Sequence, residues 1–131
     1  MKYVLSIDQS TSATKAVLFD DAGRILDKAS REHRQIYPHP GWVEHDAVEI
    51  WQNVRSVLAE LTERQQERVD NVAALSITNQ RETIVVFDRQ TGKPLANAVV
   101  WQDRRGDEIC AQLRAAGHER PGPLAGRWPP V

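Results

Sequence analysis

Short blocks of apolar residues, separated by polar turns, indicate β-strands in the first quarter of the chain. Residues 2–7 are mostly apolar, a pattern typical of a strand that is buried on both faces. Residues 13–20 instead alternate, as expected for a strand with two different faces. A turn signal at residues 20–23 then predicts a returning strand over residues 24–34. The pattern predicts three antiparallel strands in sequence order.

A long apolar stripe with helical spacing follows a Pro-rich loop at residues 37–42. Asp46 is a suitable N-cap for this helix, which we expect to continue to about Arg68. The stripe consists of Ala47, Ile50, Trp51, Val54, Val57, Leu58 and Leu61. Residues 72–77 form the next apolar run and predict a strand. A strand, a crossover helix and a second strand imply parallel pairing of the two strands.

The second half of the chain gives weaker patterns. Residues 83–88 and 95–101 are rich in apolar and β-branched residues and predict two further strands. Residues 107–116 predict a helix with Ile109, Cys110 and Leu113 on its apolar face, and Asp103 is a candidate N-cap for it. The resulting order is an α/β arrangement with a mixed sheet, which resembles the ribonuclease-H-like fold of actin, sugar kinases and Hsp70 ATPases.

A change of composition near residue 117 divides the chain. We expect a partial domain over residues 1–117 and an irregular tail over residues 118–131, because residues 121–131 contain four prolines and two glycines without any periodicity.

Composition and charge narrow the function classes. Hydrophobic residues make up 40% and charged residues 27% of the 131 residues, and the net charge is -1. Such a balance provides no general field for binding nucleic acid or an anionic membrane, so we expect neither as a partner. No apolar run approaches the ~20 residues of a membrane span. The single cysteine excludes an intrachain disulfide and favours a cytoplasmic location.

The first candidate site is the polar turn after residues 2–7. Asp8 ends the strand, hydroxyl residues including Thr11 and Ser12 follow it, and Lys15 comes next. Backbone N–H groups and hydroxyls of such a turn can bind phosphate, a carboxylate can bind Mg²⁺, and a lysine adds a positive charge. The alternative is an ordinary hairpin with a polar turn. The turn is not a Walker A motif, because the glycines are missing.

The second candidate site is the polar run at residues 78–83, after the predicted strand at 72–77. Arg81 offers a fork of donors and Glu82 a pair of acceptors, which together suit the adjacent hydroxyls of a polyol. Trp101 is a third candidate, as an apolar wall of a polyol pocket. The alternatives are a surface ion pair for the first two residues and a core or edge tryptophan for the third.

Several longer runs resemble one known family, in the family's order and spacing. They are residues 6–12 (SIDQSTS), 35–38 (QIYP), 41–46 (GWVEHD), 76–83 (SITNQRET) and 97–102 (NAVVWQ). These runs are similar to the N-terminal domain of the glycerol kinases, which belong to the FGGY carbohydrate kinases. The resemblance covers about residues 3–117 and points to glycerol kinases more than to xylulose or gluconate kinases.

On the nucleotide side, the resemblance implies that Thr11 and Ser12 meet the phosphates of ATP and that Asp8 lies near Mg²⁺. Lys15 stands where many relatives have an arginine that contacts phosphate, so the charge is kept and the bidentate fork is lost. Ser10 stands where glycine is frequent in the family, and Ala13 where a hydroxyl residue is frequent.

On the substrate side, the resemblance implies that Arg81 and Glu82 hold glycerol hydroxyls and that Trp101 forms the aromatic wall. It places the catalytic aspartate beyond residue 131, so no catalytic residue is expected in this chain.

The expected function is that of an N-terminal part of a kinase that converts glycerol and ATP to glycerol 3-phosphate and ADP, with the 131-residue chain alone inactive. One alternative is a non-catalytic module that binds a polyol or pairs with a polypeptide supplying the missing half, and a homo-oligomer is a further possibility for its assembly. Another alternative is a kinase for a different sugar, such as xylulose.

Overall fold

The computed structural model describes residues 1–118, and the expected irregular tail lies outside them except for His118. The strands are β1 (Tyr3–Gln9), β2 (Ala13–Phe19), β3 (Ile25–Glu32), β4 (Glu44–His45), β5 (Val72–Thr78) and β6 (Ala98–Val99). The helices are α1 (Ala47–Arg64), α2 (Gln66–Val69) and α3 (Asp107–Ala115).

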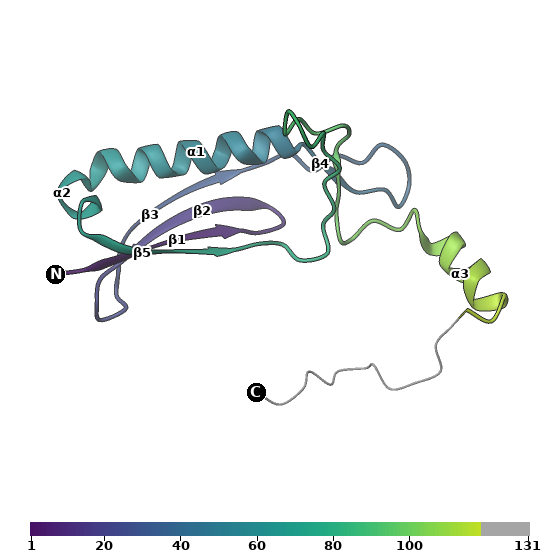
Figure 1. Ribbon diagram of the computed structural model, residues 1–131, viewed down its shortest axis with the longest axis horizontal. Coiled ribbons are helices and arrows are strands. Elements are labelled where there is room, and N and C mark those ends of the chain that lie inside the picture. Colours follow the sequence, from purple (N-terminus) through teal and green to yellow (C-terminus); the bar gives the residue numbers. More distant parts are fainter. Residues whose placement is uncertain (119–131) are drawn as a thin grey trace.

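The main sheet has four strands in the order β3-β2-β1-β5 (Figure 1). β1 pairs with β2 and β2 with β3 in antiparallel fashion, whereas β1 and β5 are parallel. This confirms the predicted meander, the parallel pairing after the crossover helix and the mixed α/β sheet. Because β1 and β5 are parallel, their carboxyl ends lie at the same end of the sheet, and the polar segments that follow them emerge there together.

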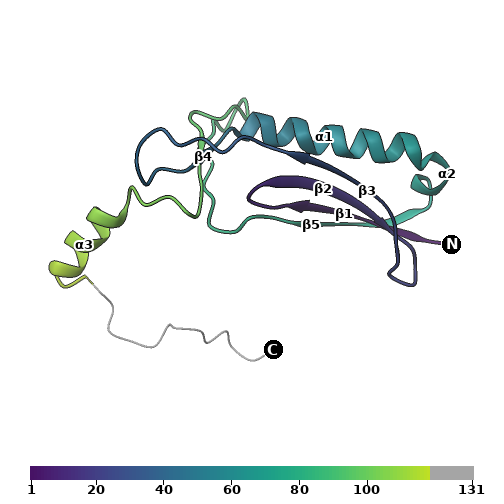
Figure 2. The same ribbon diagram turned by 180° about the vertical axis from the view of Figure 1, so that it is seen from behind.

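Helix α1 covers one face of the sheet (Figures 1 and 2). It begins at the predicted N-cap, because the Asp46 side chain accepts hydrogen bonds from the backbone N–H groups of Val48 and Glu49. The core between helix and sheet contains Ala16, Leu18, Ala29, Val57 and Leu61. Each fully buried Leu or Val contributes about 1.5–3 kcal/mol to folding, so this small cluster holds α1 in place.

Strand β5 forms an open edge of the sheet. Its apolar side chains on the α1 side are largely exposed, with Ile77 at 66%. A groove of ≈ 580 Å³ runs between β5 and α1 and is lined mainly by apolar residues, among them Trp51, Val54 and Leu75. Val4 of β1 is exposed as well, so the expectation that residues 2–7 are buried on both faces is wrong. Helix α1 covers only one face of the strand.

The later elements are shorter than the sequence predicts. Residues 83–88 form isolated bridges at Ile84 and Phe87 in place of a strand, and only Ala98–Val99 of the predicted 95–101 strand pairs regularly. Helix α1 ends at Arg64 and the short α2 follows, because the apolar stripe stops at Leu61 and the next residues are polar.

Helix α3 stands away from the sheet and from α1 in both views (Figures 1 and 2). Its predicted apolar residues Ile109, Cys110 and Leu113 are exposed. Gly106 is its N-cap, so the assignment of Asp103 to this position is wrong. Within residues 1–118, no helix combines the length and apolarity needed to cross a membrane.

Candidate active site

The turn between β1 and β2 is closed by its own residues. Ser10 donates through both its backbone N–H and its hydroxyl to the carbonyl of Ala13, at 2.9 Å each. The Thr11 carbonyl accepts from the side chains of His33 and Gln35, also at 2.9 Å each. Within residues 1–118, the backbone N–H groups of Thr11 and Ser12 have no acceptor. The side chains of His33 and Gln35 therefore hold the turn through the Thr11 carbonyl, while the backbone N–H groups of Thr11 and Ser12 remain available to bind an anion.

The segment after β5 forms the second side of the site. It leaves the sheet beside the β1–β2 turn, because β1 and β5 are parallel neighbours. Glu82 has a φ of 64°, in the left-handed region that non-glycine residues rarely adopt. Such a backbone conformation costs about 1–3 kcal/mol, and residues that adopt it are frequent at binding sites.

Both segments and Trp101 line one pocket of ≈ 440 Å³. Its lining residues are Thr11, Asn79, Gln80, Arg81, Glu82 and Trp101. The indole N–H of Trp101 donates to the hydroxyl oxygen of Thr11 at 2.9 Å, although the two residues are 90 positions apart in the sequence. Trp101 is 52% exposed, which places it at the pocket wall and not in the core. The pocket combines an arginine, a carboxylate, an aromatic face and a hydroxyl.

An ion-pair cluster fixes the segment that carries Trp101. Arg105 pairs with Asp103 at 2.8 Å and with Glu44 at 2.7 Å, and its guanidinium stacks 3.8 Å from the ring centre of Trp42. Asp103 also accepts from the backbone N–H of Val43 at 2.7 Å. The hydrogen bond from Arg105 holds the pKa of Asp103 far below its usual range, despite the opposing effect of burial. This cluster anchors residues 101–105 to residues 42–44.

A buried polar group lies beneath the pocket. His45 is 0% exposed and contacts Gln35 through Nε2 at 2.7 Å and Gln80 through Nδ1 at 3.1 Å. His33 lies edge-on to it, with ring centres 4.6 Å apart. Burial lowers the pKa of His45 from 6.5 to about 4, and the charge of a protonated His33 acts in the same direction. No local sequence pattern signals this connection, because Gln35 and Gln80 lie 10 and 35 positions away from His45.

Asp8 and Lys15 lie outside this pocket. They are cross-strand partners whose side chains pair at 3.3 Å. Neighbouring Ile7 and Ala16 face α1, so Asp8 and Lys15 lie on the opposite face of the sheet. Ser12, at the tip of the turn, does not line the pocket either.

Asp8 is a chemically suitable Mg²⁺ ligand, because Mg²⁺ is usually bound by one or two carboxylates together with water and substrate phosphates. Among residues 1–118, no cluster of three or more acidic, histidine or cysteine side chains could hold a metal by itself.

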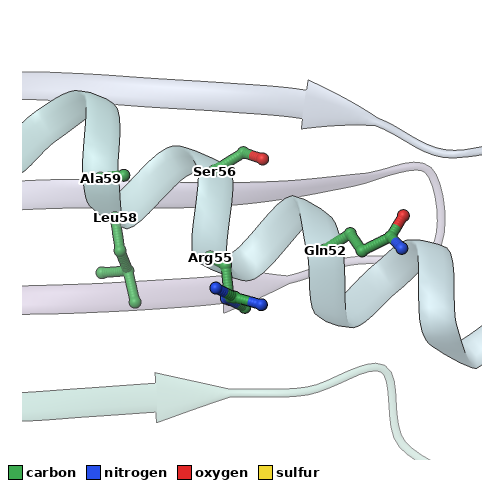
Figure 3. A pocket seen from close by; sticks show the side chains of 5 residues that line it. All are labelled: Gln52, Arg55, Ser56, Leu58 and Ala59. Carbon is green, nitrogen blue, oxygen red and sulfur yellow. The ribbon is translucent and has the colours of Figure 1, made fainter.

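A larger hollow of ≈ 710 Å³ lies along α1, lined by Gln52, Arg55, Ser56, Leu58 and Ala59 (Figure 3). All five residues come from one helix, and no second element contributes a facing polar group. The hollow is a surface depression without convergent polar groups, and it shares no lining residue with the pocket described above.

Comparison with known proteins assigns the family. The sequence profile of the FGGY family of carbohydrate kinases, N-terminal domain, matches residues 3–121. Glycerol kinase 2 of Thermotoga maritima is 50% identical over 118 residues, which are 90% of this chain and 24% of that protein. The chain thus spans about a quarter of the length of the curated relatives it matches.

Solved structures of the family show the same fold. The crystal structure of Plasmodium falciparum glycerol kinase with ADP has a TM-score of 0.78 and 39% identity, covering 88% of this chain and 23% of that one. The ligand-bound xylulose kinase of Lactobacillus acidophilus has a TM-score of 0.79 and 26% identity, covering 89% and 23%. The chain belongs to the FGGY family of carbohydrate kinases, of which it matches the N-terminal domain, and it is similar in sequence to about a quarter of the length of glycerol kinases.

Proposed function

We propose that this chain supplies the polyol-binding and phosphate-facing half of a glycerol kinase site. The observation that carries this proposal is the single pocket that joins Thr11 of the β1–β2 turn to Arg81, Glu82 and Trp101. The higher similarity to glycerol kinases than to xylulose kinases supports glycerol as the polyol.

Each pocket residue has a role that its chemistry supports. Arg81 donates to glycerol hydroxyls and Glu82 accepts from them, while the Trp101 face packs against the C–H groups. In the complete reaction, a terminal hydroxyl of glycerol attacks the γ-phosphorus of ATP in line, and its proton passes to a base outside the described residues.

The phosphates of ATP belong on the turn side. The free amides of Thr11 and Ser12 donate to phosphate oxygens, and Lys15 adds a positive charge. Asp8 would hold Mg²⁺, which neutralises charge on the phosphates when it is bound. Lys15 pairs with Asp8 here, so each of these side chains has to exchange its partner when nucleotide and metal bind. We further propose a cytoplasmic location, in keeping with the exposed free thiol of Cys110.

Equilibrium titration with glycerol tests the proposal. Arg81→Ala should weaken glycerol binding by about tenfold or more, since hydrogen bonds to charged groups contribute about 1.5–3 kcal/mol each. Arg55→Ala is the matched control, because this exposed arginine lies on α1 away from the pocket. Equal affinities of the two variants would refute the assignment. We expect no glycerol-dependent ADP release from the 131-residue chain alone.

The open edge at β5 favours a second candidate function, that of a module completed by further polypeptide. The groove between β5 and α1 exposes Trp51, Leu75 and Ile77, and an uncovered apolar face next to an edge strand favours association. We propose that polypeptide equivalent to the remainder of the relatives' length covers it, because this chain corresponds to only 24% of theirs. Analytical ultracentrifugation of the chain separates this from self-association, in which the same face would bind a second copy.

A further inference from the structure

The buried group beneath the pocket forms a one-way chain of hydrogen bonds. A backbone carbonyl can only accept, so the Gln35 amide nitrogen donates to the Thr11 carbonyl. The Gln35 amide oxygen then faces His45 Nε2 at 2.7 Å and accepts from it. His45 therefore carries its proton on Nε2, and its bare Nδ1 accepts from the side-chain nitrogen of Gln80 at 3.1 Å. Because the Thr11 carbonyl can only accept, it determines which atom donates in each of the three hydrogen bonds.

This series of hydrogen bonds joins the two sides of the pocket. Gln80 belongs to the polyol-side loop, directly before Arg81, whereas Thr11 belongs to the phosphate-side turn. His45 stands between them, is 0% exposed, and comes from β4, which belongs to neither segment. His33 donates to the same Thr11 carbonyl at 2.9 Å and so fixes it from a second direction. From the opposite side of Thr11, the hydroxyl oxygen receives the Trp101 indole N–H.

We propose that His45 is a positioning residue, which sets the polyol-side loop and the Trp101 wall in register with the phosphate-side turn. It contacts neither substrate. It acts by holding Gln80 and Gln35, and through Gln35 it holds Thr11 and the Trp101 indole. This inference deepens the proposed function, because it concerns how the two halves of that site are kept aligned. Its structural content can be tested without any ligand.

The Thr11 carbonyl can only accept, so it fixes which way Gln35 is turned and which nitrogen of His45 carries the proton. If His45 carried its proton on Nδ1, Nε2 would need a donor from Gln35, and the Gln35 oxygen would then oppose the Thr11 carbonyl oxygen. A buried clash of two acceptors costs more than the loss of one hydrogen bond. A protonated His45 would present Nδ1–H to the Gln80 nitrogen, so Gln80 would have to turn over and offer its oxygen instead. That oxygen is buried and has no partner among residues 1–118.

Nitrogen-15 NMR of the ligand-free 131-residue chain tests the proposal directly. The imidazole spectrum should show His45 protonated on Nε2 alone at neutral pH. The indole signal of Trp101 reports on the bond to Thr11, and Thr11→Val gives the position of this signal when the bond is absent. His45→Leu should move the Trp101 signal more than half of the way to that position, although His45 does not touch Trp101.

Two further variants separate positioning from general loss of structure. His45→Gln retains a donor and an acceptor and should leave the Trp101 signal near its wild-type position. His39→Leu removes an exposed histidine that contacts the Trp42 ring edge-on, and it should not move the Trp101 signal. If His45→Leu fails to fold, Gln80→Leu, which removes one link from the partly exposed side, takes its place.

The outcomes are distinct. An Nδ1-protonated His45, or a folded His45→Leu or Gln80→Leu variant with an unmoved Trp101 signal, overturns the proposal. A moved signal in both His45→Leu and His45→Gln also overturns it, because the hydrogen bonds would then not be the cause. Failure of the chain to bind glycerol would count against the proposed function and leave these spectra unaffected.

Discussion

Protonation of His45 should destabilise the folded chain at mildly acidic pH. The side chain is fully buried, and burial lowers its pKa from 6.5 to about 4. The charge of a protonated His33 contributes to this lowering, while the carboxylate of Glu49 opposes it. Because the unfolded chain takes up this proton at a higher pH than the folded chain, the stabilisation is complete above about pH 6.5 and is lost as the pH falls towards 4.

The magnitude follows from the difference between the two pKa values. Each pKa unit corresponds to about 1.4 kcal/mol, so the separation between 6.5 and about 4 amounts to about 3 kcal/mol at pH 4. About 2.5 kcal/mol of this should already be lost at pH 4.5. For a domain of this size, such a loss is a large part of the total free energy of unfolding.

Urea unfolding at a series of pH values measures this effect. The free energy of unfolding of the wild type should fall by about 2.5 kcal/mol more than that of His45→Gln between about pH 7.5 and pH 4.5. His39→Gln removes an exposed histidine and should keep the wild-type slope. If the free energies of unfolding of the wild type and His45→Gln changed in parallel with pH, the reasoning would be refuted, because His45 would then have the same pKa in the folded and the unfolded chain.

Three further predictions concern single residues of the site. Asp103→Asn should lower the free energy of unfolding by about 1.5–3 kcal/mol, since the side chain is 3% exposed and bonded to a charged group, whereas Asp107→Asn, an exposed pair, should cost less than about 1 kcal/mol by the same urea assay. Gly41→Ala should cost about 1 kcal/mol or more because φ is +81°, and Gly106→Ala, at φ -83°, should cost less in thermal unfolding. Glu82→Gly should relieve the positive φ and raise the unfolding free energy by about 1 kcal/mol, yet abolish glycerol binding in titration calorimetry; unchanged binding would contradict the assigned role.

The regular part of the fold could be predicted from local patterns. Residues 13–20 place two different sets of side chains on the two faces of β2, and Gly23 in the following turn has a φ of +76°, which glycine adopts readily. Asp46 followed by a long apolar stripe fixed the start of α1 in the correct place. These elements are determined by residues close in sequence, which is why periodicity and capping were sufficient.

The second half could not be predicted in the same way. Residues 83–88 have strand-like composition, but within residues 1–118 they pair only through isolated bridges, Ile84 with Val99 of the two-residue strand β6 and Phe87 with Pro94. Asp103 has the residue type of a helix cap, yet Arg105 and the Val43 amide hold it in a tertiary cluster. In both cases, contacts with distant residues outweigh the local preference.

The residues that line the candidate site could be predicted from the sequence, but the buried residue that holds them in place could not. The chemistry of Thr11, Arg81, Glu82 and Trp101 was visible from residue types and from the family resemblance, and these four residues line one pocket. The sequence did not separate them from Asp8 and Lys15, which lie on the sheet face opposite α1. His45 was invisible because its partners are 10 and 35 residues away and none of them forms a local motif with it.

The β1–β2 turn and the segment that follows β5 border one pocket, which we propose to be the binding site for a polyol. Nuclear Overhauser contacts between glycerol C–H protons and assigned protons of the 131-residue chain test it most directly. We expect saturable contacts to the Trp101 ring, together with shifts of the Arg81 side chain and the Thr11 amide. Contacts confined to other surfaces, such as the hollow along α1 or the groove beside β5, would contradict it.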